Sequence, residues 1–255
     1  MKYAIVDNQK IEAKKGLKGL CPLCNQPVIA KCGQFKVNHW AHISCKHCDS
    51  WWENETEWHR QWKDLFPKEW QEVISYDDKT GEKHIADIKT NMGSVIEFQH
   101  SNISIEERVS RENFYKDMIW VVDGTRRKND FKHFLNAFEY GDIWSNGENS
   151  QLEILDNAHR YLPKEWLESL VPVYFDFKGL LDQDKEKYDN DILREPLWCL
   201  LPFSGGDIKA ILESSRDVVI QKWRKGGFQL SLQALFNEAT QALIKRKQRI
   251  LSGRY

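Results

Sequence analysis

Apolar residues recur at helical spacing in the segment "NETEWHRQWKDLF", residues 54–66. Four of them fall on one face of a helix: Trp58, Trp62, Leu65 and Phe66. Asn54 is placed to cap the N-terminus with Glu57 as its capping-box partner, and Pro67 ends the pattern. The segment therefore predicts an amphipathic helix.

The pattern then changes to the alternation that is typical of strands. Strands are expected over 70–78, 83–90 and 94–101, with "DDKTGE" and "NMG" as turns between them. A second helix is expected over 103–118, followed by the buried strand "MIWVVDG", 118–124. The predicted order is therefore helix, three strands, helix, strand.

The C-terminal part of the chain predicts an α+β extension over 152–255, either as a small lobe or as a continuation of the preceding sheet. Its expected strands are "VPVYFDFKGLL" and "REPLWCLLPF", and its expected helices span 206–227 and 231–251. Asp176 lies between two phenylalanines on the first strand, so we expect a structural role. Residues 140–151 are rich in Gly, Asn and Ser and predict a linker. The expected domains are therefore 1–50, 51–140 and 152–255.

Composition and charge exclude several classes of protein. The 255 residues are 29% charged and 41% hydrophobic, as in a soluble globular protein. The formal net charge is −1, so local patches such as "TRRK" (125–128) and "KRKQR" (245–249) would have to bind a nucleic acid. The sequence contains no run of 18 apolar residues, so no membrane span is expected. The first ten residues lack the apolar core of a signal peptide. We therefore expect a cytoplasmic protein.

Cysteines are concentrated near the N-terminus. Five of the six lie between positions 21 and 48, in the company of three histidines. Two CxxC pairs, or one CxxC followed by HxxH, have the spacing of a tetrahedral zinc site, and so short a segment has little else to fold around. Reduced thiols in a loop or a redox pair are the alternatives. Cys21 and Cys24 are the firm half of the predicted zinc site. The other half is to be drawn from His39, His42, Cys45 and Cys48, and Cys32 is assigned to packing.

Two acids lie on the predicted strands 83–90 and 94–101. Asp87 shares a face with Lys89, and Glu97 shares a face with Gln99, because side chains two apart on a strand point the same way. If the strands form a hairpin, Asp87 approaches Glu97. Two close carboxylates repel each other unless a cation lies between them, and hard oxygen ligands suit Mg²⁺ or Mn²⁺. A solvated sheet face neutralised by Lys89 or Lys83 is the alternative.

The predicted first helix also carries a polar stripe beside its apolar face. Glu55, His59 and Lys63 are four residues apart, so they lie along one side of the helix. They can reach the edge of the sheet, or they can form an ordinary ladder of charges on a solvated helix.

Four blocks together resemble the CoiA-like (competence protein) family of the PD-(D/E)xK nuclease superfamily. They are "CPLC…HWAH", "NETEWHRQWK", "IADI" and "IEFQHS", within residues 15–125. The resemblance implies an α/β (α+β), restriction-endonuclease-like core in the order αβββαβ. It also implies a zinc-finger-like module before this core.

The resemblance also implies roles for single residues. Asp87, Glu97 and Glu55 would be ligands of Mg²⁺ or Mn²⁺, and Gln99 would stand where many relatives have a catalytic lysine. An amide cannot carry charge, so Lys63 is the favoured substitute, with His59 and Lys89 as alternatives. Two further residues of the second helix resemble the Arg-x-x-x-Tyr positions of the family and are candidates to touch DNA phosphates: Arg111 and Tyr115. Core packing is the alternative for Tyr115.

The implied activity is metal-dependent hydrolysis of DNA phosphodiester bonds. Competence, recombination and phage defence are all compatible settings, with protein partners in DNA processing or defence. The alternative is a non-catalytic, zinc-containing nucleic-acid-binding protein with a degenerate nuclease core, and Gln99 is the residue that keeps it open.

Overall fold

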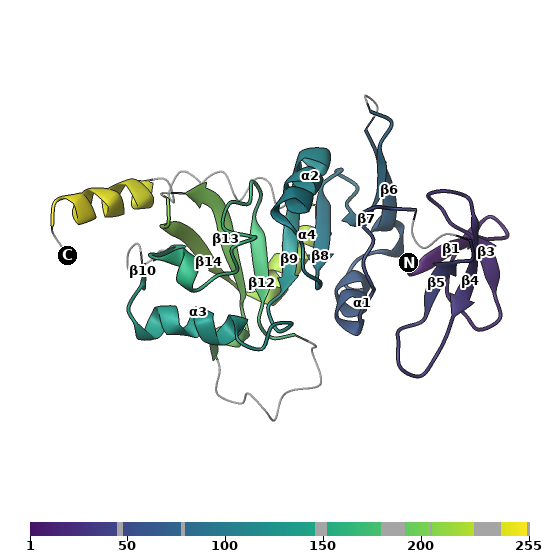
Figure 1. Ribbon diagram of the computed structural model, residues 1–255, viewed down its shortest axis with the longest axis horizontal. Helices are drawn as coiled ribbons and strands as arrows, with labels where there is room; N and C mark the ends of the chain where they lie inside the picture. The colour runs from purple at the N-terminus through teal and green to yellow at the C-terminus, as the bar shows by residue number, and fades with distance from the viewer. Residues whose placement is uncertain are drawn as a thin grey trace. The chain divides into compact units, whose positions relative to one another are not determined.

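The computed structural model describes residues 1–44, 48–77, 80–145, 152–179, 192–204, 206–226 and 241–253. The protein has a mixed α+β fold (Figure 1). The chain divides into two compact units, Met1–Ser101 and Asn102–Tyr255. The fold class is thereby confirmed at its coarse level, whereas the expected domain boundaries stay predictions.

The N-terminal unit begins with a five-stranded antiparallel sheet in the order β2-β1-β3-β4-β5 (Figure 1). Its strands are β1 Tyr3–Val6, β2 Gln9–Glu12, β3 Lys18–Leu20, β4 Pro27–Lys31 and β5 His39–His42. Buried residues, among them Ala4, Val28 and Trp40, form a core of its own. This segment therefore has more to fold around than its cysteines, contrary to what its short Cys-rich sequence indicates.

Helix α1, Glu57–Asp64, confirms the first predicted helix, but its cap differs from the prediction. Thr56 is the N-cap, and its side-chain oxygen accepts a hydrogen bond from the backbone N–H of His59. The ring of His59 in return accepts from the backbone of Thr56 and completes the capping box. The assignment of Asn54 and Glu57 was wrong by two residues, because Thr56 is the residue with extended backbone angles.

A short 3₁₀ turn, Lys68–Trp70, leads into the three predicted strands. They are β6 Gln71–Tyr76, β7 Lys83–Lys89 and β8 Val95–Gln99. They pair antiparallel in the order β6-β7-β8, and Ile88 lies opposite Ile96. Every residue of β8 is buried, whereas β7 after its exposed first residue alternates between buried and half-buried positions, with Asp87 among the latter.

The second unit contains a sheet in the order β10-β11-β14-β13-β12-β9. Strands β9 and β12 are parallel, with Asp123 opposite Asp176, and the other pairs are antiparallel. Its helices are α2 Ile105–Tyr115, α3 Asp130–Glu139 and α4 Arg216–Arg224. Its strands are β9 Met118–Asp123, β10 Ile143–Ser145, β11 Leu152–Leu155, β12 Val173–Asp176, β13 Leu197–Ser204 and β14 Lys209–Ser214. Two 3₁₀ turns lie at Ala158–Arg160 and Ile192–Arg194.

Three predictions for this unit need correction or lie partly outside the described residues. The helix expected over 206–227 is wrong in its first half, because 209–214 pairs with β11 and β13 as β14. In the expected linker, 143–145 forms β10, while 146–151 lies outside the described residues. The last predicted helix is seen over 241–251, and 227–240 is not described.

Aromatic side chains fill the core of the second unit. The ring of Phe134 on α3 lies 5.0 Å from those of Phe177 and Trp198. Asp176 is fully buried and accepts hydrogen bonds from Arg216, in keeping with its expected structural role. None of the helices in the described part of the chain is long and apolar enough to cross a membrane.

Candidate functional site

Lys63 on α1 lies within ion-pair distance of three carboxylates in the N-terminal unit. Its Nζ is 2.8 Å from Asp87 Oδ1, 3.3 Å from Glu72 Oε1 and 3.5 Å from Glu55 Oε1. The side chains of Lys63, Glu55 and Glu72 are buried, and that of Asp87 is 20% exposed. We call these four residues the Lys63 cluster. The ladder of charges on a solvated helix is therefore not what forms, because Lys63 points into the protein.

Glu72 is the member of the cluster that sequence reasoning missed. Its carboxylate accepts backbone hydrogen bonds from Lys2, at 2.6 Å, and from Tyr3, at 3.0 Å. Its φ angle is +47°, a left-handed conformation that is uncommon for a residue other than glycine and that is often found at functional sites. No sequence signal marks it, because the backbone groups that hold its carboxylate lie about seventy positions away.

The electrostatics keep Lys63 charged. Burial alone would lower the pKa of Lys63, but the carboxylates of Asp87, Glu55 and Glu72 raise it well above its ordinary value. Burial would likewise raise the pKa of Glu72, but Lys63 and the nearby N-terminus hold it at about 2. In this arrangement Lys63 is a fixed cation and not a proton acceptor.

The β7–β8 hairpin brings Asp87 and Glu97 side by side. The backbone N–H of Asp87 donates to Glu97 Oε1 at 3.2 Å, and that of Phe98 donates to Asp87 Oδ2 at 3.0 Å. Each carboxylate thus accepts a backbone hydrogen bond from the opposite strand, beyond the last paired residues. The cation that offsets the charge of Asp87 is the ammonium group of Lys63.

Of the three acids predicted to bind a divalent ion, Asp87 and Glu97 are suitably placed, whereas Glu55 is not. Mg²⁺ is commonly held by one or two carboxylates together with water and substrate phosphates, and Asp87 with Glu97 supplies such a pair. Glu55 is held instead by Arg60, at 2.9 Å, and by Lys63. The adjacent pair therefore suits the ion better than the predicted trio does.

Glu53 is a second acid that sequence reasoning missed. Its carboxylate accepts hydrogen bonds from His59 Nε2 at 2.5 Å, from Gln99 Nε2 at 3.0 Å, and from the backbone and hydroxyl of Ser101. Burial alone would raise its pKa, but the bonds from His59, Ser101 and His100 hold the pKa of Glu53 at about 2. Glu53 therefore ties the start of α1 to the end of β8.

The other residues considered for the role of the missing lysine form hydrogen bonds elsewhere. His59 Nδ1 accepts from the backbone of Thr56, so its Nε2 carries the proton that it donates to Glu53 and to the carbonyl oxygen of Phe98. The amide of Gln99 is directed to Glu53, and Lys89 Nζ donates to Ser75 Oγ at 3.2 Å. Of the candidates, Lys63 is the cation beside Asp87.

Arg111 and Tyr115 lie on α2 in the second unit and contact other side chains there. Arg111 forms an ion pair with Glu107, and its guanidinium group lies 5.7 Å from the ring centre of Trp120. The ring of Tyr115 packs edge-on against Phe114 at 5.0 Å. These contacts stabilise the protein, and a role in holding DNA stays a prediction.

A separate cluster of cysteines and histidine lies in the N-terminal sheet. Ligand atoms of Cys21, Cys24, His42 and Cys48 all lie within 4.8 Å of one another. Within the described ranges, this is the one group of three or more His, Cys, Asp or Glu side chains that is close enough to hold a metal ion. Cys21 Sγ is 3.5 Å from Cys48 Sγ, and Cys24 Sγ is 3.3 Å from His42 Nε2. We call it the Cys₃His cluster.

The spacing within the Cys₃His cluster fits zinc. With Zn–S bonds of about 2.3 Å, two sulfurs of a tetrahedron are about 3.8 Å apart, close to the Cys21–Cys48 distance. Burial raises the pKa of the Cys21 thiol, which is costly for a lone thiolate. A divalent cation among the four side chains would offset that cost.

The cluster settles part of the ligand choice that the sequence left open. His39 and His42 are three residues apart on β5, so their side chains lie on opposite faces of the strand. His42 belongs to the cluster, whereas His39 Nδ1 lies 2.9 Å from the carbonyl oxygen of Val37. Cys32 is outside the cluster and packs beside the core. Cys45 lies outside the described residues.

A family model matches the segment that contains the N-terminal sheet and the Cys₃His cluster. Residues 4–50 match the family model of competence protein CoiA, N-terminal domain. The match to the CoiA domain covers the five strands except Tyr3, the first residue of β1, and it covers the whole Cys₃His cluster and ends before α1. No curated protein and no solved structure matches the chain. The CoiA match therefore includes none of Lys63, Asp87 and Glu97.

Proposed function

We propose that the protein is a Mg²⁺- or Mn²⁺-dependent nuclease that hydrolyses DNA phosphodiester bonds. The observation that carries the proposal is the position of Lys63, a buried and charged lysine 2.8 Å from the carboxylate of Asp87, whose backbone N–H donates to a second acid, Glu97. Carboxylates beside a fixed cation are what hydrolysis of a phosphodiester requires, since negative charge develops on the phosphate. The CoiA match over residues 4–50 supports a role in DNA processing.

Asp87 and Glu97 would hold the divalent ion, which would supply an activated water and stabilise charge on the leaving oxygen. Lys63 remains protonated and would place its positive charge toward the phosphate oxygens. Glu72 and Glu55 orient the lysine side chain from the other side. Glu53 and His59 stabilise the junction of α1 with β8, on which the acids depend.

The Cys₃His cluster would hold a structural zinc ion. Four protein ligands complete a tetrahedron and leave no open position for a substrate or water, as is usual for structural zinc sites. We therefore assign catalysis to the Asp87–Glu97 pair and stability of the N-terminal sheet to zinc.

A second candidate is a nucleic-acid-binding protein without catalysis. The contacts of Lys63 favour it, because an ammonium group surrounded by three carboxylates is also the arrangement of a purely structural ion cluster. The amide of Gln99, which cannot carry charge, points the same way.

Cleavage by matched variants distinguishes the two candidates. Asp87→Asn and Glu97→Gln should each lower Mn²⁺-dependent cleavage of plasmid and single-stranded DNA by at least about 100-fold, whereas fluorescence anisotropy should show DNA binding near that of the wild type. Glu69→Gln replaces an exposed acid just after α1 and should leave the rate unchanged. Equal cleavage by both acid variants and the wild type would contradict the assignment. Binding without cleavage by the wild type would support the second candidate.

A further inference from the structure

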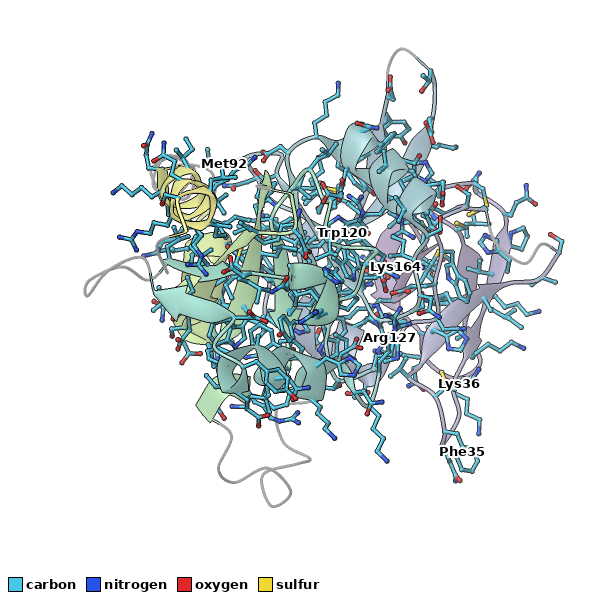
Figure 2. The ribbon with its side chains drawn as sticks, turned by 60° about the vertical axis from the view of Figure 1, so that its left-hand side comes forward. Phe35, Lys36, Met92, Trp120, Arg127 and Lys164 are labelled. Atoms are coloured by element: carbon cyan, nitrogen blue, oxygen red, sulfur yellow. The ribbon has the colours of Figure 1, made fainter. Side chains whose placement is uncertain are left out.

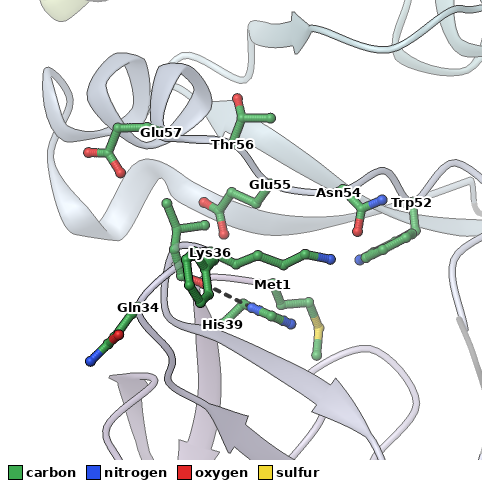
Figure 3. A pocket seen from close by; sticks show the side chains of 11 residues that line it. Met1, Gln34, Lys36, His39, Trp52, Asn54, Glu55, Thr56 and Glu57 are labelled. Carbon is green, nitrogen blue, oxygen red and sulfur yellow. Dashed lines mark hydrogen bonds between the residues drawn. The ribbon is translucent and has the colours of Figure 1, made fainter.

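A pocket of about 570 Å³ opens in the N-terminal unit beside Glu55. One wall is the loop between β4 and β5, with Phe35 and Lys36, and the other is the segment 52–57 that leads into α1 (Figure 3). Its volume lies in the range of sites for small molecules and cofactors, about 300–1,000 Å³. Neither the zinc site nor the Lys63–Asp87 pair accounts for it.

The groups around the pocket are those that contact nucleotides. Flat rings come from Phe35, Trp52 and His39, an amide from Asn54 and an ammonium group from Lys36. In Figure 3 the side chain of Lys36 extends across the pocket toward Trp52, and His39 faces it from β5. Aromatic rings stack on bases of any sequence, and a lysine contacts the backbone phosphates.

Phe35 is the most informative of these residues. It is 98% exposed, and Figure 2 shows it with Lys36 at the outer end of their loop. An exposed phenylalanine gains nothing in the isolated protein, whereas a ring that covers a bound base would be buried in the complex.

Glu55 connects the pocket to the Lys63 cluster. Its side chain points into the pocket in Figure 3, and its Oε1 is 3.5 Å from Lys63 Nζ, which in turn contacts Asp87. The pocket therefore borders the Lys63 cluster through Glu55.

We propose that this pocket binds one unpaired nucleotide of a DNA strand, and that the substrates are single strands or duplexes with an unpaired end. The inference rests on the proposed function for the position of the cleaved phosphate, but base binding by itself does not require catalysis. A base within a duplex is stacked and paired, so the pocket reaches it only after the cost of unpairing is met.

Binding is tested on the full-length protein without added Mg²⁺ or Mn²⁺. The probes are a single-stranded oligonucleotide that carries 2-aminopurine and a blunt, fully paired duplex that contains the same strand. We expect the wild type to bind the single strand more tightly and to quench its fluorescence by stacking. Phe35→Ala should weaken single-strand binding by about 5- to 100-fold, the value of one stacking contact, and should reduce the quenching.

Three controls make the result specific to the pocket. Tyr76→Ala removes another exposed aromatic side chain of the same unit and should bind like the wild type. Lys36→Gln should weaken binding, whereas Lys31→Gln, at an exposed position on β4, should not. Phe35 is solvent-exposed, so its loss leaves the fold intact and a weaker complex reports on binding.

The outcomes separate this inference from the proposed function. Equal binding and quenching by Phe35→Ala and the wild type, or tighter binding of the blunt duplex, would overturn the nucleotide pocket even if Asp87→Asn has lost cleavage. Phe35-dependent binding by a wild type that cleaves no DNA would support the pocket and reject the nuclease.

Discussion

Lys63 offsets the free-energy cost of burying several acids close together. Three carboxylates lie around its ammonium group, and two of them are as buried as the lysine itself. Buried charges of one sign are costly unless a partner of the other sign is present. Lys63 supplies that partner whether or not a divalent ion is bound.

Replacing Lys63 by methionine should therefore destabilise the protein strongly. At pH 7 we expect a loss of about 3–5 kcal/mol in the free energy of unfolding, since the acids are left without their cation. The folded-state pKa of Glu72, about 2, is depressed by Lys63, so this stabilisation is present above the ordinary carboxyl pKa and is lost as pH falls toward 2. The deficit of the variant should therefore shrink when urea unfolding is repeated at pH 3.5.

The matched control is Lys68→Met, at an exposed lysine of the turn after α1, which should change stability by less than about 0.5 kcal/mol. Equal stability of the Lys63 and Lys68 variants at pH 7 would contradict the central position of Lys63.

His84 should make the stability of the N-terminal unit depend on pH. Its Nδ1 lies 2.7 Å from Asp49 Oδ1 and its Nε2 lies 2.8 Å from Glu82 Oε1. Burial would lower the pKa of His84, but hydrogen bonds and charges of the two acids raise it. A raised folded-state pKa stabilises the protein below about pH 6.5, the ordinary histidine value, and this stabilisation is lost as pH rises through the folded-state pKa.

Urea unfolding between pH 5.5 and 8.5 measures this effect. The wild type should lose stability as pH rises, and His84→Gln should remove that part of the pH dependence, because a glutamine does not titrate. His133→Gln, on α3 of the second unit, is the control and should keep the wild-type slope. The same slope in His84→Gln and the wild type would show that His84 does not titrate differently on folding.

The N-terminal sheet is an element stabilised from two sources. Its apolar core contains Trp40, Val28 and Leu23, and Cys21 and Cys24 lie in the turn between β3 and β4. The backbone of that turn is closed by bonds from Cys21 to Gln26 and from Asn25 to Cys21, at 2.9 Å each. A bound zinc ion would add His42 and Cys48 to this turn and thereby join β5 to it.

Cys21→Ser should lose zinc and unfold the sheet. Metal analysis of the purified wild type should give about one zinc per chain, and structural zinc supplies on the order of 10 kcal/mol in small modules. Cys32→Ser is the control, because Cys32 is outside the Cys₃His cluster, and it should keep its zinc. A wild type that contains no zinc would contradict the assignment.

At the scale of the whole molecule, the division into two units limits how far the loss of zinc should spread. The second unit has its own core, with Trp120, Trp198 and Phe175 fully buried. Amide hydrogen exchange of the Cys21→Ser variant should therefore rise in β1–β5, while β12–β14 keep the protection of the wild type.

Local patterns in the sequence determined the elements between residues 57 and 123. Helical and strand periodicities need only neighbouring residues, and the short turn between β7 and β8 places Asp87 beside Glu97 because strand side chains alternate. The CxxC spacing likewise marks Cys21 and Cys24, since both ligands lie in one turn. Such features depend on short-range geometry, which a sequence displays directly.

Only the tertiary structure decided which distant groups complete these local features. Glu72 joins Lys63 because the backbone of Lys2 and Tyr3 holds its carboxylate from another sheet, and His42 replaces His39 because pairing with Val28 turns that face of β5 toward the cysteines. The segment 209–214 becomes a strand because β11 and β13 pair with it on both sides. In each case the groups that fix the residue or strand in place are distant in sequence, and only the folded chain brings them together.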